Sequence, residues 1–127
     1  MIVLDASALL ELLLRTPTGE RVEKRIFAET LHVPHLLDLE VLQALRRYCQ
    51  KKILTTEHAA QAWGILLDLP LRRYAHWIVL PRIWQLRDHL TAYDACYVAL
   101  AEALDATLLT CDHALADHRG QARVELA

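Results

Sequence analysis

The chain has 127 residues, of which 54% are apolar and 24% charged, with three glycines and four prolines. This composition excludes disordered, collagen-like and low-complexity chains, and the length predicts one domain over residues 1–127. The net charge of −2 favours no class of partner by itself. No uncharged stretch approaches the roughly 20 apolar residues of a membrane span, and Asp5 interrupts the apolar start. We therefore expect a cytoplasmic protein without a secretory leader.

The first half of the chain alternates short apolar runs with longer amphipathic stretches. Its predicted elements are a strand at Ile2–Leu4, a helix at Ala8–Leu14, a helix from Pro17 to about Thr30, a strand at Leu31–Pro34 and a helix at Leu37–Lys52. Ser7 is the expected N-cap of the first helix.

The second half continues this alternation. Its predicted elements are a helix from Thr55 or Thr56 to Leu69, a strand at Leu71–Tyr74, a helix at Trp77–Leu90, a helix at Thr91–Leu104, a strand at Ala106–Thr110, a short helix at His113–Asp117 and a strand at Ala122–Leu126. Short strands alternating with helices predict an α/β fold. We expect a helix-rich, three-layer α/β/α sandwich with a short, mainly parallel sheet of four to five strands.

Several kinds of site lack their motifs in this sequence. The three cysteines include no CxxC pair, which favours reduced thiols, and the seven histidines include no HExxH zinc motif. The three glycines are isolated and form no phosphate-binding loop. The chain also lacks the G-x-S-x-G nucleophile motif of hydrolases.

Acidic residues follow the predicted strands or begin the predicted helices. They are Asp5, Glu40, Asp94 and Asp112, with Asp38 as a fifth candidate. In parallel sheets, ligands bind outside the carboxyl ends of the strands, so we expect the first four to share one edge. Each acid alone also has a structural explanation, because the helix dipole favours acids in first turns. Asp94 has one more alternative, as the capping-box partner of Thr91.

Carboxylates gathered at one edge repel one another, and without a cation some of them must take up protons. All-oxygen acidic sites suit hard cations, chiefly Mg²⁺ or Mn²⁺. Such a cation with open water positions generates a nucleophile from water and neutralises charge on a phosphate. The acids therefore predict a metal centre for phosphoryl-transfer chemistry.

Charge is distributed in blocks along the chain. Two basic blocks contain no acid, namely Arg46, Arg47, Lys51 and Lys52, and then Arg72, Arg73, Arg82 and Arg87. From Asp88 to His118 there are acids but no Lys or Arg. The blocks are either solvated helix faces or a polyanion-binding surface beside an acidic metal site.

Four segments resemble the PIN domain, and more narrowly the VapC toxins of bacterial toxin–antitoxin pairs. They are Val3–Ala8 (VLDASA), Leu39–Arg47 (LEVLQALRR), Leu90–Ala95 (LTAYDA) and Leu108–Asp112 (LLTCD). The resemblance implies that Asp5, Glu40, Asp94 and Asp112 bind metal and that Thr110 matches a hydroxyl residue of the last motif. Thr110 and Ser7 are candidates for supporting the metal ligands. The resemblance also implies an Mg²⁺- or Mn²⁺-dependent endoribonuclease and a VapB-type antitoxin as partner.

We therefore expect a ribonuclease toxin that hydrolyses RNA phosphodiesters with metal-activated water. Arg46, Arg47, Lys51 and Lys52 are candidates for contacting the RNA backbone. Tyr93 and Trp77 either stack on unpaired bases or pack in the core. The high apolar fraction favours a homodimer, and the Leu-rich first two helices suggest a groove for the antitoxin, with an antitoxin arginine in the acidic pocket.

Two other functions are alternatives to a ribonuclease toxin. A non-catalytic PIN-like module would use the acidic edge only to dock a basic peptide. A phospho-acceptor receiver domain needs an acidic pair near the first strand and a late lysine, but Asp5 stands alone and Lys52 is the last lysine.

Overall fold

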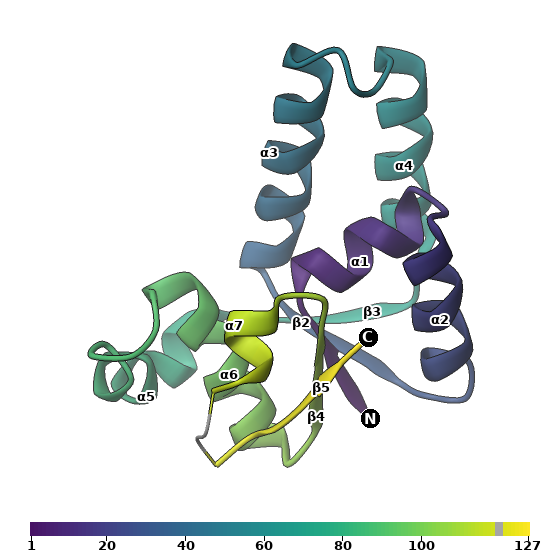
Figure 1. Ribbon diagram of the computed structural model, residues 1–127. Coiled ribbons are helices and arrows are strands. Elements are labelled where there is room, and N and C mark those ends of the chain that lie inside the picture. Colours follow the sequence, from purple (N-terminus) through teal and green to yellow (C-terminus); the bar gives the residue numbers. More distant parts are fainter. Residues whose placement is uncertain (119–120) are drawn as a thin grey trace.

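The computed structural model describes residues 1–118 and 121–127, which form one parallel sheet covered by helices (Figure 1). The strands are β1 (Ile2–Leu4), β2 (Leu31–Pro34), β3 (Leu71–Tyr74), β4 (Thr107–Thr110) and β5 (Arg123–Leu126). Their order is β3-β2-β1-β4-β5, and every neighbouring pair is parallel. The expected short, mainly parallel sheet is confirmed and is parallel at every pairing.

Helices fill the connections between these strands. They are α1 (Ala6–Leu13), α2 (Pro17–Ile26), α3 (Leu36–Gln50), α4 (Thr56–Asp68), the 3₁₀-helix η1 (His76–Val79), α5 (Leu80–Gln85), α6 (Ala92–Leu104) and α7 (His113–Ala116). The chain moves outward from β1 to β3 and then returns across the sheet to β4. Because such crossovers are right-handed, this reversal puts α1–α4 on one face and α5–α7 on the other, which confirms the three-layer arrangement (Figure 1).

Side-chain caps begin most of the longer helices. Thr16, Thr55 and Thr91 accept hydrogen bonds from backbone N–H groups at the starts of α2, α4 and α6. The expectation that Ser7 caps the first helix is wrong. Asp5 has an extended backbone and accepts a bond from the Ser7 N–H, and its negative charge suits a helix N-terminus.

The predicted helix at Trp77–Leu90 is also wrong. The segment forms η1 and then the short α5, which ends at Gln85. Pro81 explains the division, because proline has no N–H to donate and fits the first turn of a helix but not its interior. The second helix ends at Ile26 rather than near Thr30. The other boundaries differ by a residue or two, as helix and strand ends commonly do.

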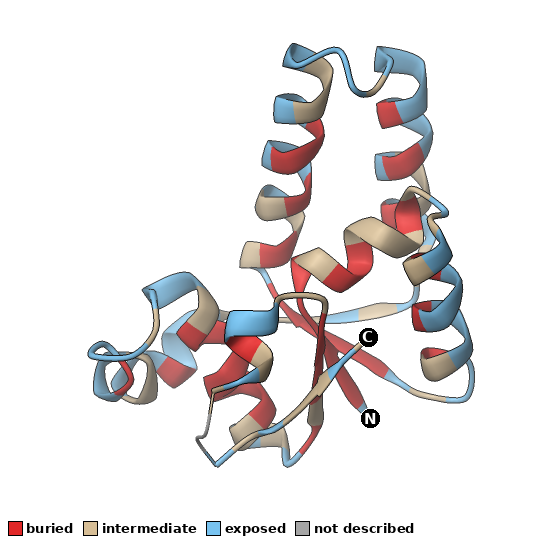
Figure 2. Ribbon diagram, in the orientation of Figure 1, coloured by how far each residue is buried: buried red, intermediate tan, exposed pale blue. Residues whose placement is uncertain are grey.

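The core lies between the sheet and the helices of each face (Figure 2). Strand β1 is buried along its whole length, as is the stretch 95–101 of α6, which packs on β1, β2 and β4. On the other face, α1 and α2 pack closely at Gly19. A Cβ there would lie 2.1 Å from the carbonyl oxygen of Glu11, so only glycine allows this approach.

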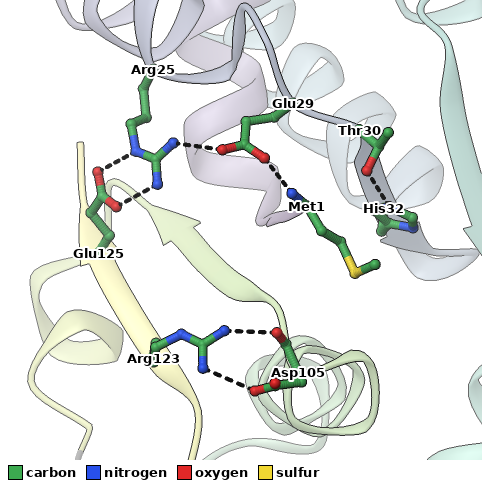
Figure 3. Close-up of polar contacts among 8 residues, drawn as sticks. All are labelled: Met1, Arg25, Glu29, Thr30, His32, Asp105, Arg123 and Glu125. Carbon is green, nitrogen blue, oxygen red and sulfur yellow. Dashed lines mark hydrogen bonds and ion pairs between the residues drawn. The ribbon is translucent and has the colours of Figure 1, made fainter.

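Ion pairs hold the outer parts of the fold together (Figure 3). Arg25 of α2 makes a two-pronged pair with Glu125 of β5, at 2.8 and 3.0 Å, and Arg123 of β5 binds Asp105 after α6. The first pair is partly exposed and the second is exposed, so each contributes little to stability. The three cysteines are free, as expected. Over the described residues, no helix is long and apolar enough to cross a bilayer.

Candidate metal centre

Asp5 lies at the point where the strand order reverses. Strand β1 pairs with β2 on one side and β4 on the other, and the chain leaves these strands in opposite directions. Parallel sheets bind ligands in the crevice outside the carboxyl ends of strands at such a point. Asp5 directly follows β1, and Thr110 is the last residue of β4, so both lie at this edge.

A hydrogen-bond network fixes the carboxylate of Asp5. Its Oδ2 accepts from the hydroxyl of Thr110 at 2.5 Å and its Oδ1 from the Ser7 N–H at 2.6 Å. The Ser7 hydroxyl lies 3.2 Å from that of Thr110 and accepts from the Cys111 N–H at 2.9 Å. The two hydroxyl residues expected to support the site therefore join β1 to β4 and hold Asp5 in place.

Asp112 lies two residues beyond β4 at the same edge. Its N–H donates to the hydroxyl of Thr110 at 3.0 Å, which links its backbone to the Asp5 network. Its Oδ1 accepts from the Ala114 N–H at 2.9 Å and caps α7. The cap holds one carboxylate oxygen near the strand end.

Glu40 and Asp94 come from helices on opposite faces of the sheet. Glu40 lies in the second turn of α3, and Asp94 in the first turn of α6. The Asp94 N–H donates to the Thr91 hydroxyl at 3.1 Å, so Thr91 does cap α6. In the part of the chain described, the Asp94 carboxylate makes no return bond to Thr91, so the capping box is only half formed.

The four acids act on one another electrostatically. Burial raises the pKa values of Asp5, Glu40 and Asp94, and the negative charges of neighbouring acids raise them further. The charge of Asp112 raises the pKa of Asp5, and the charges of Asp5 and Asp94 raise that of Glu40. The pKa of Asp94 is raised by the charges of Asp5 and Asp112. Hydrogen bonds to Asp5 and Glu40 oppose the shift without reversing it. Four segments distant in sequence therefore bring like charges close together.

The donor set fits a hard divalent cation. Among the ion pairs of the described residues, none includes Asp5, Glu40, Asp94 or Asp112, so no side-chain cation balances the cluster. Carboxylate oxygens are the ligands that Mg²⁺ and Mn²⁺ prefer. In their present side-chain positions, the described residues contain no group of three or more His, Cys, Asp or Glu that could hold a metal ion, so binding requires the four carboxylates to move closer together.

Asp38, the fifth acidic candidate, has a different role. Both its oxygens accept bonds from the guanidinium of Arg73 on β3, at 2.8 and 3.0 Å. This two-pronged pair ties the first turn of α3 to an edge strand and neutralises the carboxylate. Asp38 therefore does not join the acidic cluster.

The two basic blocks differ in what they contact. In the second block, Arg73 pairs with Asp38, Arg82 pairs with Glu102 of α6, and Arg87 lies over the ring of Trp84. These arginines serve the fold. The first block is exposed and makes no ion pair with any described residue, and it lies at the far end of α3: Arg46, Arg47, Lys51 and Lys52.

The two aromatic candidates do not pack in the core. Trp77 is 70% exposed on η1, and Tyr93 is 62% exposed one residue before Asp94. The core-packing alternative is therefore wrong for both. Sequence reasoning missed Tyr97, whose buried hydroxyl donates to Glu40 Oε1 at 2.5 Å. The available signal was its spacing from Asp94, since residues three apart share a helix face.

Two adjoining hollows lie where α1 and α2 face α4. One, of about 510 Å³, is lined by apolar side chains such as Leu12, Ile26 and Ile65, together with charged ones. The other, of about 640 Å³, shares Arg15 and Ile65 with the first. The Leu-rich first helix and its successor thus line a groove with α4, but the groove is less apolar than expected, because His58, Gln61 and Asp68 line the second hollow.

Comparisons with known proteins identify the family of the chain. The sequence matches the PIN domain family over residues 2–121. Ribonuclease VapC12 of Mycobacterium tuberculosis is 42% identical over 127 residues, covering 99% of this chain and 98% of that protein. Ribonuclease VapC9 of the same strain is 45% identical over 123 residues, covering 97% and 94%.

Solved structures share the fold. PAE2754 from Pyrobaculum aerophilum superposes with a TM-score of 0.67 at 26% identity, covering 97% of this chain and 82% of that one. VapBC2 from Rickettsia felis, bound to a DNA fragment from its promoter, reaches a TM-score of 0.74 at 16% identity, covering 100% and 99%. At that identity the second likeness shows the fold alone.

Proposed function

The chain belongs to the PIN domain family, among the VapC ribonucleases, and on that premise we propose that it is a divalent-metal-dependent endoribonuclease acting as the toxin of a toxin–antitoxin pair. One observation carries the proposal: at the switch point of a parallel sheet the charges of Asp5, Glu40, Asp94 and Asp112 act on one another, and none of the ion pairs among the described residues includes them. In this proposal residues 1–127 work as one domain in the cytoplasm.

Each group at the site has a part in phosphodiester hydrolysis. When bound there, Mg²⁺ or Mn²⁺ supplies an activated water and neutralises charge on the phosphate. Asp5 is the most rigid ligand, because Thr110 and Ser7 hold both its oxygens. Asp94 and Glu40 bring ligands from the two faces of the sheet, and Asp112 brings one from the end of β4. Water, and not the RNA 2′-hydroxyl, attacks the phosphate in this proposal. The products therefore carry 5′-phosphate and 3′-hydroxyl ends.

The direct test is Asp94→Asn, which removes one negative ligand with little change in shape. We expect RNA cleavage to fall by about two orders of magnitude or more, because metal electrostatics contribute several kcal/mol to the transition state. Cleavage of a labelled RNA with Mn²⁺, and then with excess EDTA, measures both the variant and the metal requirement.

Asp38→Asn is the matched control, since it makes the same change at the same edge of the sheet. Its carboxylate is paired with Arg73, so the variant loses stability but keeps its cleavage rate. Full cleavage in EDTA, or a 2′,3′-cyclic phosphate product, contradicts the proposal. No cleavage by the folded wild type with Mn²⁺ also contradicts it, and that outcome supports the alternative of a non-catalytic module whose acidic edge docks a basic peptide.

The partners follow from the surfaces beside the site. We propose a VapB-type antitoxin with an apolar segment in the groove between α1, α2 and α4 and an arginine facing the acidic cluster, where a guanidinium pairs well with carboxylates. Two copies of the chain are expected to associate as a homodimer. Large apolar side chains exposed on η1 and α5 offer a surface for this: Trp77, Ile78, Leu80 and Trp84.

A further inference from the structure

The buried hydroxyl of Tyr97 has a member of the acidic cluster as its hydrogen-bond partner. Tyr97 is 1% exposed and is the largest of the fully buried side chains. Its hydroxyl donates to Glu40 Oε1 at 2.5 Å, which joins α6 to α3. The bond links two elements that approach the site from opposite faces of the sheet.

This bond leaves half of the Glu40 carboxylate available. Oε1 is occupied by Tyr97, whereas no donor among the described residues reaches Oε2. A glutamate side chain has several rotatable bonds, so an anchor at one oxygen restricts where the other can lie. A bond from a neutral donor to a carboxylate is also stronger than one between neutral groups.

Tyr97 also shares a helix face with Asp94. The two residues are three apart in α6, so their side chains lie on neighbouring positions of one surface. One turn of α6 therefore supplies both Asp94, an acid of the cluster, and the buried hydroxyl of Tyr97, which donates to Glu40. A buried tyrosine hydroxyl with only a structural role can donate to a free backbone carbonyl at a helix end. The Tyr97 hydroxyl instead donates to an acid of the cluster.

We propose that Tyr97 is a positioning residue: its hydroxyl holds Glu40 toward Asp5 and Asp94 and thereby sets the affinity of the cluster for a divalent cation. The inference rests on the proposed function, because it requires that the four acids bind metal.

The test is Mn²⁺ binding to the purified protein, followed by electron paramagnetic resonance without substrate. Tyr97→Phe keeps the ring and removes the donor. We expect its dissociation constant for Mn²⁺ to rise roughly 10- to 100-fold, the usual cost of losing a hydrogen bond to a metal ligand. The cleavage rate at saturating Mn²⁺ should change much less than the Mn²⁺ concentration that gives half the rate.

Tyr74→Phe is the matched control. The Tyr74 hydroxyl lies 2.7 Å from His32 Nδ1, so this variant also loses a tyrosine hydrogen bond, but one made to no member of the cluster. It should keep the wild-type Mn²⁺ affinity. In a Glu40→Gln background, adding Tyr97→Phe should change the affinity little, because the two residues act through one contact.

The outcomes separate this inference from the proposed function. If the wild-type protein binds no Mn²⁺ and cleaves RNA in EDTA, the metal chemistry itself is wrong. If the wild type binds Mn²⁺ and Tyr97→Phe binds it equally well, only the positioning role is overturned. Should Tyr97→Phe fail to fold, Tyr97→4-fluorophenylalanine fills the place of the hydroxyl without a donor and decides: a loss of affinity of about tenfold or more supports the role, and wild-type affinity contradicts it.

Discussion

His32 shows how a single buried polar residue shapes the response of this protein to pH. The side chain is 3% exposed on β2, with Nε2 2.9 Å from the Thr30 hydroxyl and Nδ1 2.7 Å from that of Tyr74. Burial lowers the pKa of His32 below its ordinary value, and the positive charge of Arg72 lowers it further. The folded state therefore favours the neutral ring.

The sign of the resulting pH dependence follows from linkage. Because the folded pKa of His32 is lower, the unfolded chain binds the proton more readily, and stability is lost as pH falls from about 6.5 toward the folded value. His32→Gln keeps polar atoms but does not titrate. We expect the urea midpoint of the wild type to fall more than that of His32→Gln between pH 7.5 and 5.5.

A control separates His32 from the other histidines. His76→Gln changes an exposed ring on η1 and should leave the wild-type pH dependence intact. Equal slopes for the wild type and His32→Gln would show that His32 does not control this loss of stability. The comparison uses differences between variants because the acids of the cluster, whose pKa values are raised, act in the opposite direction.

At the scale of elements, α3 joins the acidic site to the exposed basic block. Its inner face buries Leu37, Val41 and Leu45, and Glu40 lies at the border of that face. With 3.6 residues per turn, Arg47 is almost two full turns after Glu40 and lies on the same side, about 10 Å along the axis. Arg46 is turned about 100° further from that side.

This geometry predicts unequal roles for two adjacent arginines. Arg47→Ala should weaken RNA binding and raise KM several-fold with little change in kcat, because a phosphate contact positions the substrate without entering the chemistry. Arg46→Ala removes the same charge from the neighbouring position and should have a smaller effect. Steady-state cleavage at two salt concentrations measures both. Equal losses would mean that the block acts only through its net charge.

At the scale of the whole molecule, the acidic edge and the groove are formed by different elements. The edge is formed where the strands end, whereas the groove lies between α1, α2 and α4. One antitoxin chain that inhibits by the proposed route must contact both. Its affinity would then come largely from the groove, and its inhibition from the charged contact at the edge.

Variants on α4 test this division. Ile65 lines both hollows, so Ile65→Asp should weaken binding of the cognate antitoxin at least about tenfold, as expected for an apolar contact at the centre of an interface, while RNA cleavage persists. Leu67→Asp puts the same charge on an exposed residue of α4 outside the hollows. This variant should bind the antitoxin as tightly as the wild type does. Titration calorimetry gives both affinities. If Ile65→Asp binds the antitoxin as the wild type does, the antitoxin uses another surface.

Local signals in the sequence determined the element types and most of their order. Apolar runs at β1 and β4, the threonine starts of α4 and α6, and the alternation of strands and helices predicted a three-layer parallel fold. These features depend on neighbouring residues, which is why sequence alone reveals them. The same holds for Asp5, Glu40, Asp94 and Asp112 as candidates, because strand ends and helix starts can be read locally. Their role as metal ligands stays a prediction.

Only the tertiary structure decided which polar residues meet. Asp38 and Glu40 are two residues apart at the start of one helix, yet Asp38 is paired with Arg73 of β3 while Glu40 is bound by Tyr97 of α6. Thr110 reaches Asp5 across 105 residues because β4 pairs beside β1. Such contacts depend on strand order and crossover direction, which no short stretch of sequence contains. The division of the basic residues into ion-paired and exposed groups has the same origin, since each partner comes from a distant element.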